Sequence, residues 1–136
     1  MKQEKKFQNA IINAFELKKF YVLAGVLTPG HPDITTFRHG ESCLVELKDI
    51  TDISLSSHAR DIFQRAQLPW MMKFQRQDRG ATFIAIADEK KYYVYIVDSM
   101  PAVIFLKEKN LEEVLKRSIQ FCSLNKMVNY IIGDYI

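Results

Sequence analysis

The stretch GHPDITTFRHGESCLVELKD, residues 30–49, places two acids inside segments that otherwise look like β-strands. DITTF and SCLVELK are rich in β-branched and aromatic residues, and RHGE between them carries a glycine, so the stretch predicts a β-hairpin. The loop contains either His39 and Gly40 alone or four residues with the same centre, and both choices give one register. In that register Asp33 lies directly opposite Glu46.

Lys48 belongs on the same face as these two acids, because side chains alternate along a strand. Opposed residues have Cβ atoms roughly 4.5 to 5.5 Å apart, and like charges at that spacing destabilise a sheet. A divalent cation between Asp33 and Glu46 would remove the repulsion, and Mg²⁺ suits two carboxylates supplemented by water and phosphate. The residues alone leave an alternative open, in which both acids face solvent on an edge hairpin.

Pro32-Asp33, followed one hairpin later by Glu46-Leu47-Lys48, resembles the PD-(D/E)xK motif of a nuclease superfamily. The resemblance implies that Asp33, Glu46 and the backbone carbonyl of Leu47 bind Mg²⁺ or Mn²⁺. It also implies that Lys48 orients the attacking water and stabilises charge. The expected reaction is hydrolysis of a DNA phosphodiester bond, in which the cation stabilises developing negative charge.

The run FQRAQLPWMMKFQRQDRGATFIAIAD, residues 63–88, is similar to the continuation of this motif in virus-type replication-repair nucleases and in bacterial and phage Holliday-junction resolvases. In those proteins a glutamine at a helix is followed by a glycine and a hydrophobic strand, and Gln67, Trp70 and Gly80 match that layout. Gln67 is accordingly expected to hold the water shell or a phosphate. The resemblance covers roughly residues 4–97 and implies an α/β, restriction-endonuclease-like mixed β-sheet flanked by helices, here as a single domain over residues 1–136.

A third acid for the metal site is expected at Glu4, which matches a glutamate that related nucleases place at the start of their first helix. The alternative is that Glu4 simply interacts favourably with the helix dipole. Arg65, Lys73 and Arg76 belong to a basic cluster after the motif and are expected to contact DNA phosphates, although solvated helix faces commonly carry such residues. The net charge of +3 permits nucleic-acid binding without requiring it.

The expected activity is that of a structure-selective endonuclease acting on Holliday junctions or other branched DNA, of a type found in phages and mobile elements. Alternatives are a nickase of flaps or duplex DNA and a noncatalytic nucleic-acid-binding module on the same fold. Resolution of a four-way junction needs two symmetric nicks, so a chain with one site is expected to form a homodimer. The apolar tail, residues 127–136, and the first helix are the expected contacts, unless the tail packs on its own sheet.

The sequence also predicts where the protein acts. The charged N-terminus is unlike a signal peptide, and no apolar run approaches the length of a membrane span, so a cytoplasmic protein is expected. Cys43 and Cys122 are too widely spaced for a metal framework and are expected to be buried thiols.

Hydrophobic periodicity and turn residues predict the remaining elements. They are a helix over residues 3–19, an extended run over 20–27, a helix capped by Ser56 or Ser57 through about Arg65, a second helix from near Pro69 that ends by Gly80, strands over 81–88 and 92–97, and an Asn110-capped helix over 111–122. The tail is expected to be a closing strand or a self-association surface.

Overall fold

The computed structural model describes residues 2–25, 29–38, 41–77 and 80–133. Its centre is a six-stranded sheet in which the strands follow one another in chain order, β1-β2-β3-β4-β5-β6. Among the described strands, β3 and β4 pair in parallel and the other neighbours are antiparallel. A parallel pair needs a crossover connection, and here that connection contains η1 and α2.

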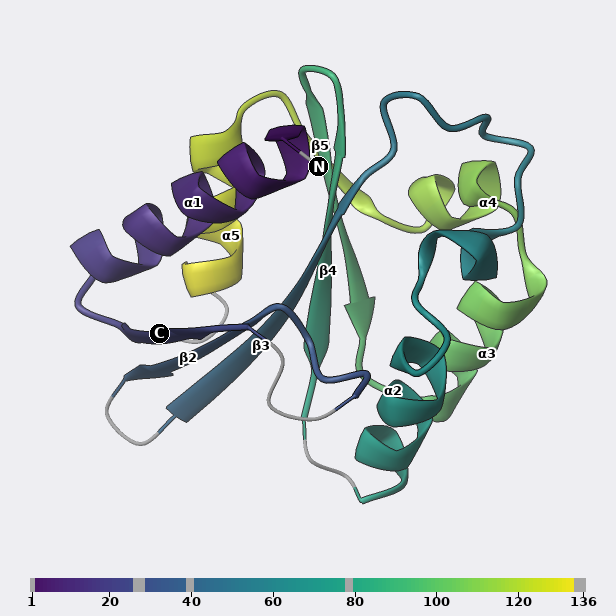
Figure 1. The fold of residues 1–136 in the computed structure, drawn as a ribbon, viewed down its shortest axis with the longest axis horizontal. Helices are drawn as coiled ribbons and strands as arrows, with labels where there is room; N and C mark the ends of the chain where they lie inside the picture. Colours follow the sequence, from purple (N-terminus) through teal and green to yellow (C-terminus); the bar gives the residue numbers. More distant parts are fainter. Residues whose placement is uncertain (1, 26–28, 39–40, 78–79, 134–136) are drawn as a thin grey trace.

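Helices and groups of strands are interspersed along the chain, which gives an α/β fold with a mixed sheet, as predicted (Figure 1). In chain order the elements are α1 (Lys2–Leu17), β1 (Tyr21–Ala24), β2 (Ile34–Arg38), β3 (Glu41–Asp49), the 3₁₀ helix η1 (Ala59–Ile62), α2 (Gln67–Arg76), β4 (Thr82–Asp88), β5 (Lys91–Val97), α3 (Met100–Glu108), α4 (Leu111–Lys116), β6 (Ile119–Phe121) and α5 (Leu124–Gly133).

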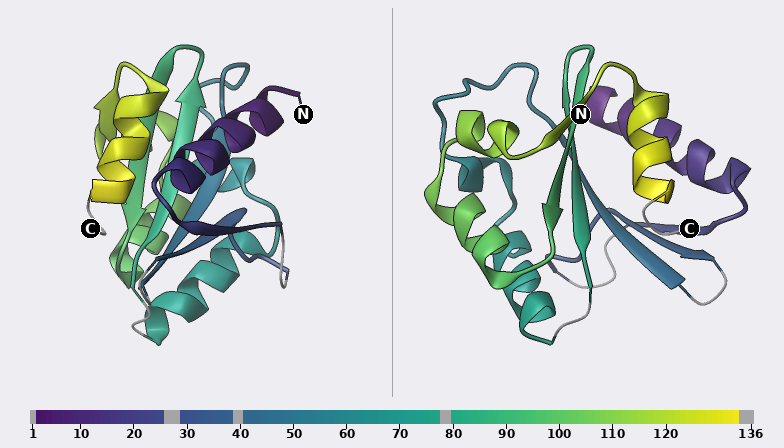
Figure 2. Two further views of the ribbon diagram at one scale, coloured as in Figure 1. Left: turned by 90° about the vertical axis from the view of Figure 1, so that its left-hand side faces the viewer. Right: turned by 180° about the vertical axis from the view of Figure 1, so that it is seen from behind.

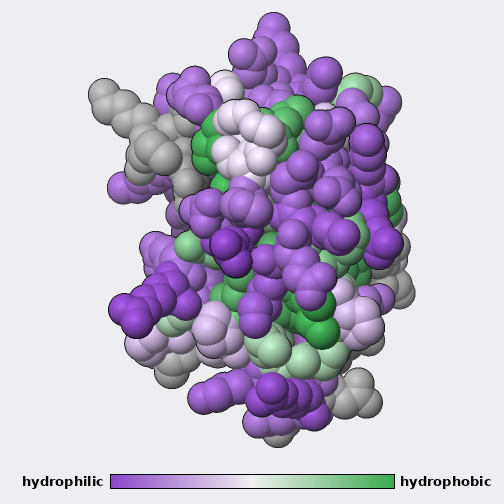
Figure 3. All heavy atoms as spheres, turned by 90° about the vertical axis from the view of Figure 1, so that its right-hand side faces the viewer, coloured by the Kyte–Doolittle hydropathy of each residue, from purple (hydrophilic) through white to green (hydrophobic). Residues whose placement is uncertain are grey.

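Helices cover both faces of the sheet, and Figure 2 shows α1 and α5 together on one face. Phe7, Ile11 and Phe15 recur at helical spacing on α1 and are buried against that face with alternate residues of β3. The opposite face packs against α2, α3 and α4 through a second core cluster that includes Ile84 and Ile86 of β4. The outward side of these three helices is mostly hydrophilic, with smaller hydrophobic areas between the charged side chains (Figure 3).

The hairpin of β2 and β3 has the predicted register. Ile34 pairs with Val45 and Thr36 with Cys43, so Asp33 comes opposite Glu46 at the next position. Val45 and Leu47 of β3 point to the α1 and α5 face, and this alternation directs Glu46 and Lys48 to the face that α2 covers. The loop residues His39 and Gly40 lie outside the described residues.

The segment before α2 differs from the prediction. No α-helix is capped by Ser56 or Ser57; instead the short helix η1 begins after His58, whose side chain makes no capping bond. The preceding loop is held by backbone hydrogen bonds to the α3–α4 junction, from Leu111 N–H to the Ser57 carbonyl at 2.9 Å and from Glu112 N–H to the Leu55 carbonyl at 3.0 Å. The loop itself contains a turn, closed by Ser57 N–H donating to the Ser54 carbonyl at 3.0 Å, so the backbone here is tied to α4 and does not continue into an α-helix.

The second half of the chain contains a helix that the sequence reading missed, α3. Its start is marked by Ser99, whose hydroxyl accepts a hydrogen bond from Ala102 N–H, and by Pro101 in the first turn. Asn110 caps α4 as predicted, but α4 ends at Lys116 rather than continuing to Cys122. The residues after it form β6, because pairing with β5 satisfies their backbone groups.

Residues 127–133 of the tail belong to a helix, α5, rather than to a closing strand, and residues 134–136 lie outside the described residues. The helix buries Met127, Val128, Ile131 and Ile132 in the core shared with α1, so these side chains are not available for self-association. Cys43 is buried as predicted, whereas Cys122 is exposed because it lies between β6 and α5. In the described ranges no helix is long and apolar enough to cross a membrane.

Candidate active site

Asp33 and Glu46 meet at the start of β2 and in the middle of β3. The backbone N–H of Asp33 donates to Glu46 Oε1 at 3.2 Å, and the backbone N–H of Leu47 donates to Asp33 Oδ2 at 3.0 Å. Each acid is therefore fixed by the backbone of the strand that carries the other. Glu46 is fully buried and Asp33 is half-buried, so the pair extends from the interior toward solvent.

Lys48 and Gln67 complete the cluster around Glu46. Lys48 Nζ lies 3.1 Å from Glu46 Oε2 and donates to Gln67 Oε1 at 3.1 Å. Gln67 Nε2 donates to the same Glu46 oxygen at 2.6 Å, which closes a ring of three polar side chains. All three are buried, and a fully connected network of this kind restrains each side chain to one orientation.

Gln67 is the first residue of α2, and its side chain reaches Glu46 and Lys48 of β3. Gln67 Oε1 also accepts the backbone N–H of Gln64 at 2.8 Å, so the side chain bridges the helix start and the strand. Pro69 is compatible with this position because backbone N–H groups in a first turn need no helical partner. Phe63 adds a contact that the sequence did not reveal, since Lys48 Nζ lies 5.3 Å from the centre of its ring.

Gly30 brings the Asp33 segment against α2. Its φ of +87° is in the region that favours glycine, and a Cβ added there would collide with the carbonyl oxygen of Ala66 and come within 2.8 Å of Trp70 Cβ. A side chain at residue 30 would push the loop away from the helix. The GHP run before Asp33 was the available sequence signal for this close approach.

Burial raises the pKa of the Glu46 carboxyl to about 7. The attraction of the Lys48 ammonium opposes that rise, and the negative charge of Asp33 adds to it. Near neutral pH, Glu46 thus lacks sufficient positive charge around it to be fully ionised. A further cation at the Asp33–Glu46 pair would favour the ionised form.

The donors present fit a magnesium ion, which commonly takes one or two protein carboxylates and fills its other positions with water and phosphate. Asp33 and Glu46 supply two carboxylates on neighbouring strands. In the described part of the chain no cluster of three or more His, Cys, Asp or Glu side chains could hold a metal. Glu4 lies in α1, but its side chain is outside what the structure describes, and the role of the Leu47 carbonyl stays a prediction.

The predicted DNA contacts lie on exposed positions of one segment. Arg65 stands between η1 and α2, and Lys73 and Arg76 lie in the last turn of α2. All three side chains are exposed. Lys73 and Arg76 belong to the helix that packs on the sheet face of Glu46, since Gln67 of the same helix contacts that carboxylate.

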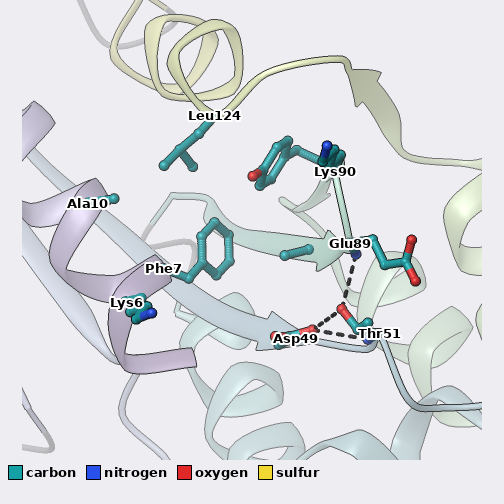
Figure 4. A pocket seen from close by; sticks show the side chains of 10 residues that line it. Lys6, Phe7, Ala10, Asp49, Thr51, Glu89, Lys90 and Leu124 are labelled. Atoms are coloured by element: carbon teal, nitrogen blue, oxygen red, sulfur yellow. Dashed lines mark hydrogen bonds between the residues drawn. The ribbon is translucent and has the colours of Figure 1, made fainter. Parts of the chain in front are cut away.

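A separate pocket of about 570 Å³ opens on the other face of the sheet, at the ends of β3 and β4 (Figure 4). Phe7 of α1 and Leu124 of α5 line it, together with Asp49 and Thr51. Asp49 Oδ1 accepts hydrogen bonds from both the N–H and the hydroxyl of Thr51, which fixes the turn after β3. Asp49 therefore stabilises this turn. The pocket is distinct from the site of Asp33 and Glu46.

The fold of this chain is similar to that of solved structures, one of which is an archaeal chain of known fold. Residues covering 91% of this chain superimpose on 98% of the chain of Archaeoglobus fulgidus Hjc, a Holliday junction resolvase from an archaeal hyperthermophile, with a TM-score of 0.54 and 14% sequence identity. The two chains share a fold. No protein-family model matches the sequence, and a search of curated proteins found no similar sequence. At this identity the likeness establishes the fold alone, and the chemistry must be argued from the side chains.

Proposed function

We propose that this protein is a metal-dependent endonuclease that hydrolyses phosphodiester bonds in branched DNA. The observation that supports this most directly is the meeting of Asp33, Glu46, Lys48 and Gln67 at one place on the sheet, in the order of the PD-(D/E)xK motif. A protein that only bound DNA would gain nothing from opposed carboxylates beside phosphates. The shared fold with a Holliday junction resolvase agrees with this proposal.

Asp33 and Glu46 would hold Mg²⁺ or Mn²⁺ beside the scissile phosphate, and Glu4 is a candidate third ligand. When bound, the ion supplies positive charge that stabilises the developing oxyanion and lowers the pKa of water. Lys48 brings a further positive charge to the same site, and its position depends on Glu46 and Gln67.

Lys48 can also act on the attacking water. Its ammonium group is held by two hydrogen-bonding partners and by the Phe63 ring, so its remaining N–H can be directed at a water or a phosphate oxygen. Gln67 fixes that direction, because its amide contacts both the ammonium and the carboxylate. We assign Lys48 the role of orienting the water and Gln67 that of positioning Lys48.

A homodimer is part of the proposal, because one chain carries one Asp33–Glu46 pair and junction resolution needs two nicks. The buried apolar side chains of α5 no longer support the tail as the contact. Tyr21 and Phe37 are a better choice, since they pair directly across β1 and β2 and are 67% and 39% exposed at the edge of the sheet. Sedimentation equilibrium should show a dimer that Tyr21→Ser weakens.

The proposed function is tested by incubating the protein with end-labelled four-way junction, flap, plain duplex and single-stranded DNA, each with Mg²⁺, Mn²⁺ or a chelator. Metal-dependent cleavage that is fastest on the junction is expected. Preferential cutting of flaps or duplex would replace the branched-DNA assignment with a nickase. Binding of all substrates without cleavage under any metal would contradict enzymatic activity.

A further inference from the structure

Three aromatic rings form a column beside the carboxylate pair. Trp70 and Phe74 lie one turn apart on α2, and their rings are stacked with centroids 5.0 Å apart at an angle of 15°. The imidazole of His31 meets the Trp70 ring edge-on at 5.1 Å. The column therefore runs from the loop before β2 along the outside of α2.

The column is anchored in the core through its middle ring, Trp70. Trp70 packs against the core cluster beneath α2, α3 and α4, whereas Phe74 belongs to neither core cluster. Within the described residues, the ring contact that holds Phe74 is its stack on Trp70. Phe74 is half-buried, so part of its surface remains open to solvent. A large apolar ring held outward in this way can accept another flat ring.

The column and the carboxylates belong to one rigid unit. His31 precedes Asp33 by two residues, and Trp70 follows Gln67 by one helical turn. The close approach of Gly30 to Ala66 and Trp70 joins the loop to the helix at this point. His31 and Trp70 therefore lie next to the segments that carry Asp33 and Gln67.

The positively charged side chains on α2 suit the binding of a nucleic-acid strand. Lys73 and Arg76 belong to the same last turns of α2 as Phe74, and both are exposed. Cations that track phosphates, combined with aromatic rings on which bases stack, are the features by which proteins bind unpaired nucleotides. In a paired duplex the faces of the bases are covered by their neighbours, so only an unpaired or displaced base can use such a platform.

We propose that Phe74, supported by Trp70 and His31, is a stacking site for an unpaired base of the DNA strand that the protein cuts. The proposal rests on the proposed nuclease function and adds a source of selectivity to it. Branched DNA exposes base faces where strands exchange, and plain duplex does not. The competing explanation is that the rings only pack the Gly30–Pro32 loop onto α2.

Trp70 is the single tryptophan of the chain, so its fluorescence reports on this place directly. The test titrates the protein, in a chelator that prevents cleavage, with a short single-stranded oligonucleotide and with an abasic strand of equal length and charge. Binding is followed independently by the anisotropy of a label on the DNA. Stacking predicts that the base-bearing strand quenches the emission and binds about fivefold or more tightly than the abasic strand.

Equal affinity and equal emission change with the two strands, or no binding preference at all, would overturn the stacking site. This comparison uses the unaltered protein and depends on no variant. A second comparison uses Phe74→Leu, which keeps Trp70 as the reporter and should lose the preference for the base-bearing strand.

The matched control is Phe121→Leu, which removes a half-buried ring that contacts Tyr130 on the opposite face of the sheet. It should retain the preference, and an equal loss in both variants would overturn the assignment to Phe74. The cleavage assay separates this proposal from the nuclease function. Cleavage without a base preference contradicts only the stacking site, and a base preference without cleavage contradicts only the enzyme.

Discussion

Asp33 and Glu46 face each other across β2 and β3, and the N–H of Asp33 donates to Glu46 Oε1 at 3.2 Å. The return bond runs from Leu47 N–H to Asp33 Oδ2. This mutual attachment means that the geometry of the acid pair depends on the hairpin register and not on flexible side chains. A shift of one residue would direct Glu46 to the α1 face and destroy the site.

Gly30→Ala should destabilise the protein, because a Cβ at this positive φ collides with the carbonyl of Ala66. We expect a loss on the order of 2 kcal/mol in the free energy of unfolding, measured by urea denaturation. Gly25→Ala is the matched control, since Gly25 also has a positive φ but nothing within 4 Å of the added Cβ. Equal losses in the two variants would show that contact with α2 is unimportant.

Lys48→Met should lower the cleavage rate roughly 100-fold or more, the usual contribution of a group that acts on the attacking water. Its affinity for DNA should remain nearly unchanged, because Lys48 is buried in the Glu46 network and not on the exposed basic surface. Single-turnover cleavage and equilibrium binding measure the two effects separately. A variant with weaker binding but a normal rate at saturation would contradict the proposed role.

The sequence predicted the half of the chain that bears the site better than the other half. The β-prone segments on either side of a glycine-containing loop were sufficient to predict the register in which Asp33 lies opposite Glu46. Pro69 predicted that α2 starts near Gln67. These signals are local, so no tertiary information was needed. The family motif indicated Gln67 as a site residue, but its contacts with Glu46 and Lys48 were not predicted.

The elements that were predicted wrongly from the sequence lie where tertiary contacts override local preference. The serine-rich loop before η1 does not form a helix because α4 holds its backbone. Residues 119–121 continue the apolar pattern of α4 but pair with β5 instead. The apolar tail was expected to form a closing strand or a self-association surface. Ile131 and Ile132 instead lie on a helix that packs on α1.

Glu46 should make the stability of the metal-free protein depend on pH. Its pKa is raised from 4.5 to about 7 in the folded state, so between these values the folded chain retains a proton that the unfolded chain has released. The contribution of Glu46 to stability is thus fully present below about pH 4.5 and is lost as the pH rises to about 7. The difference in unfolding free energy between wild type and Glu46→Gln should change by on the order of 3 kcal/mol over this range. Denaturation in a chelator at several pH values measures it, and a constant difference would contradict the raised pKa.

Replacing Arg65, Lys73 and Arg76 together by alanine should weaken binding to every DNA substrate. Each lost phosphate contact lowers the slope of log affinity against log salt by about one unit, so the salt dependence should flatten. The matched control replaces Lys5, Lys18 and Lys126, which are also exposed but belong to or adjoin α1 and α5 on the other face. An unchanged slope in the first variant, or an equal change in the control, would mean that the α2 side is not the DNA-binding surface.

The central claim is that Asp33 and Glu46 form the metal-binding centre of a nuclease. Its most direct test is single-turnover cleavage of a four-way junction with Mg²⁺ by wild type, Glu46→Gln and Asp49→Asn. The glutamine preserves the shape of Glu46 but removes its charge, whereas Asp49 is an acid of the same strand that contacts Thr51 on the opposite face. We predict that Glu46→Gln abolishes cleavage while it remains folded, and that Asp49→Asn cuts at nearly the wild-type rate. Cleavage by Glu46→Gln at the rate of the wild-type protein would contradict the assignment of this site.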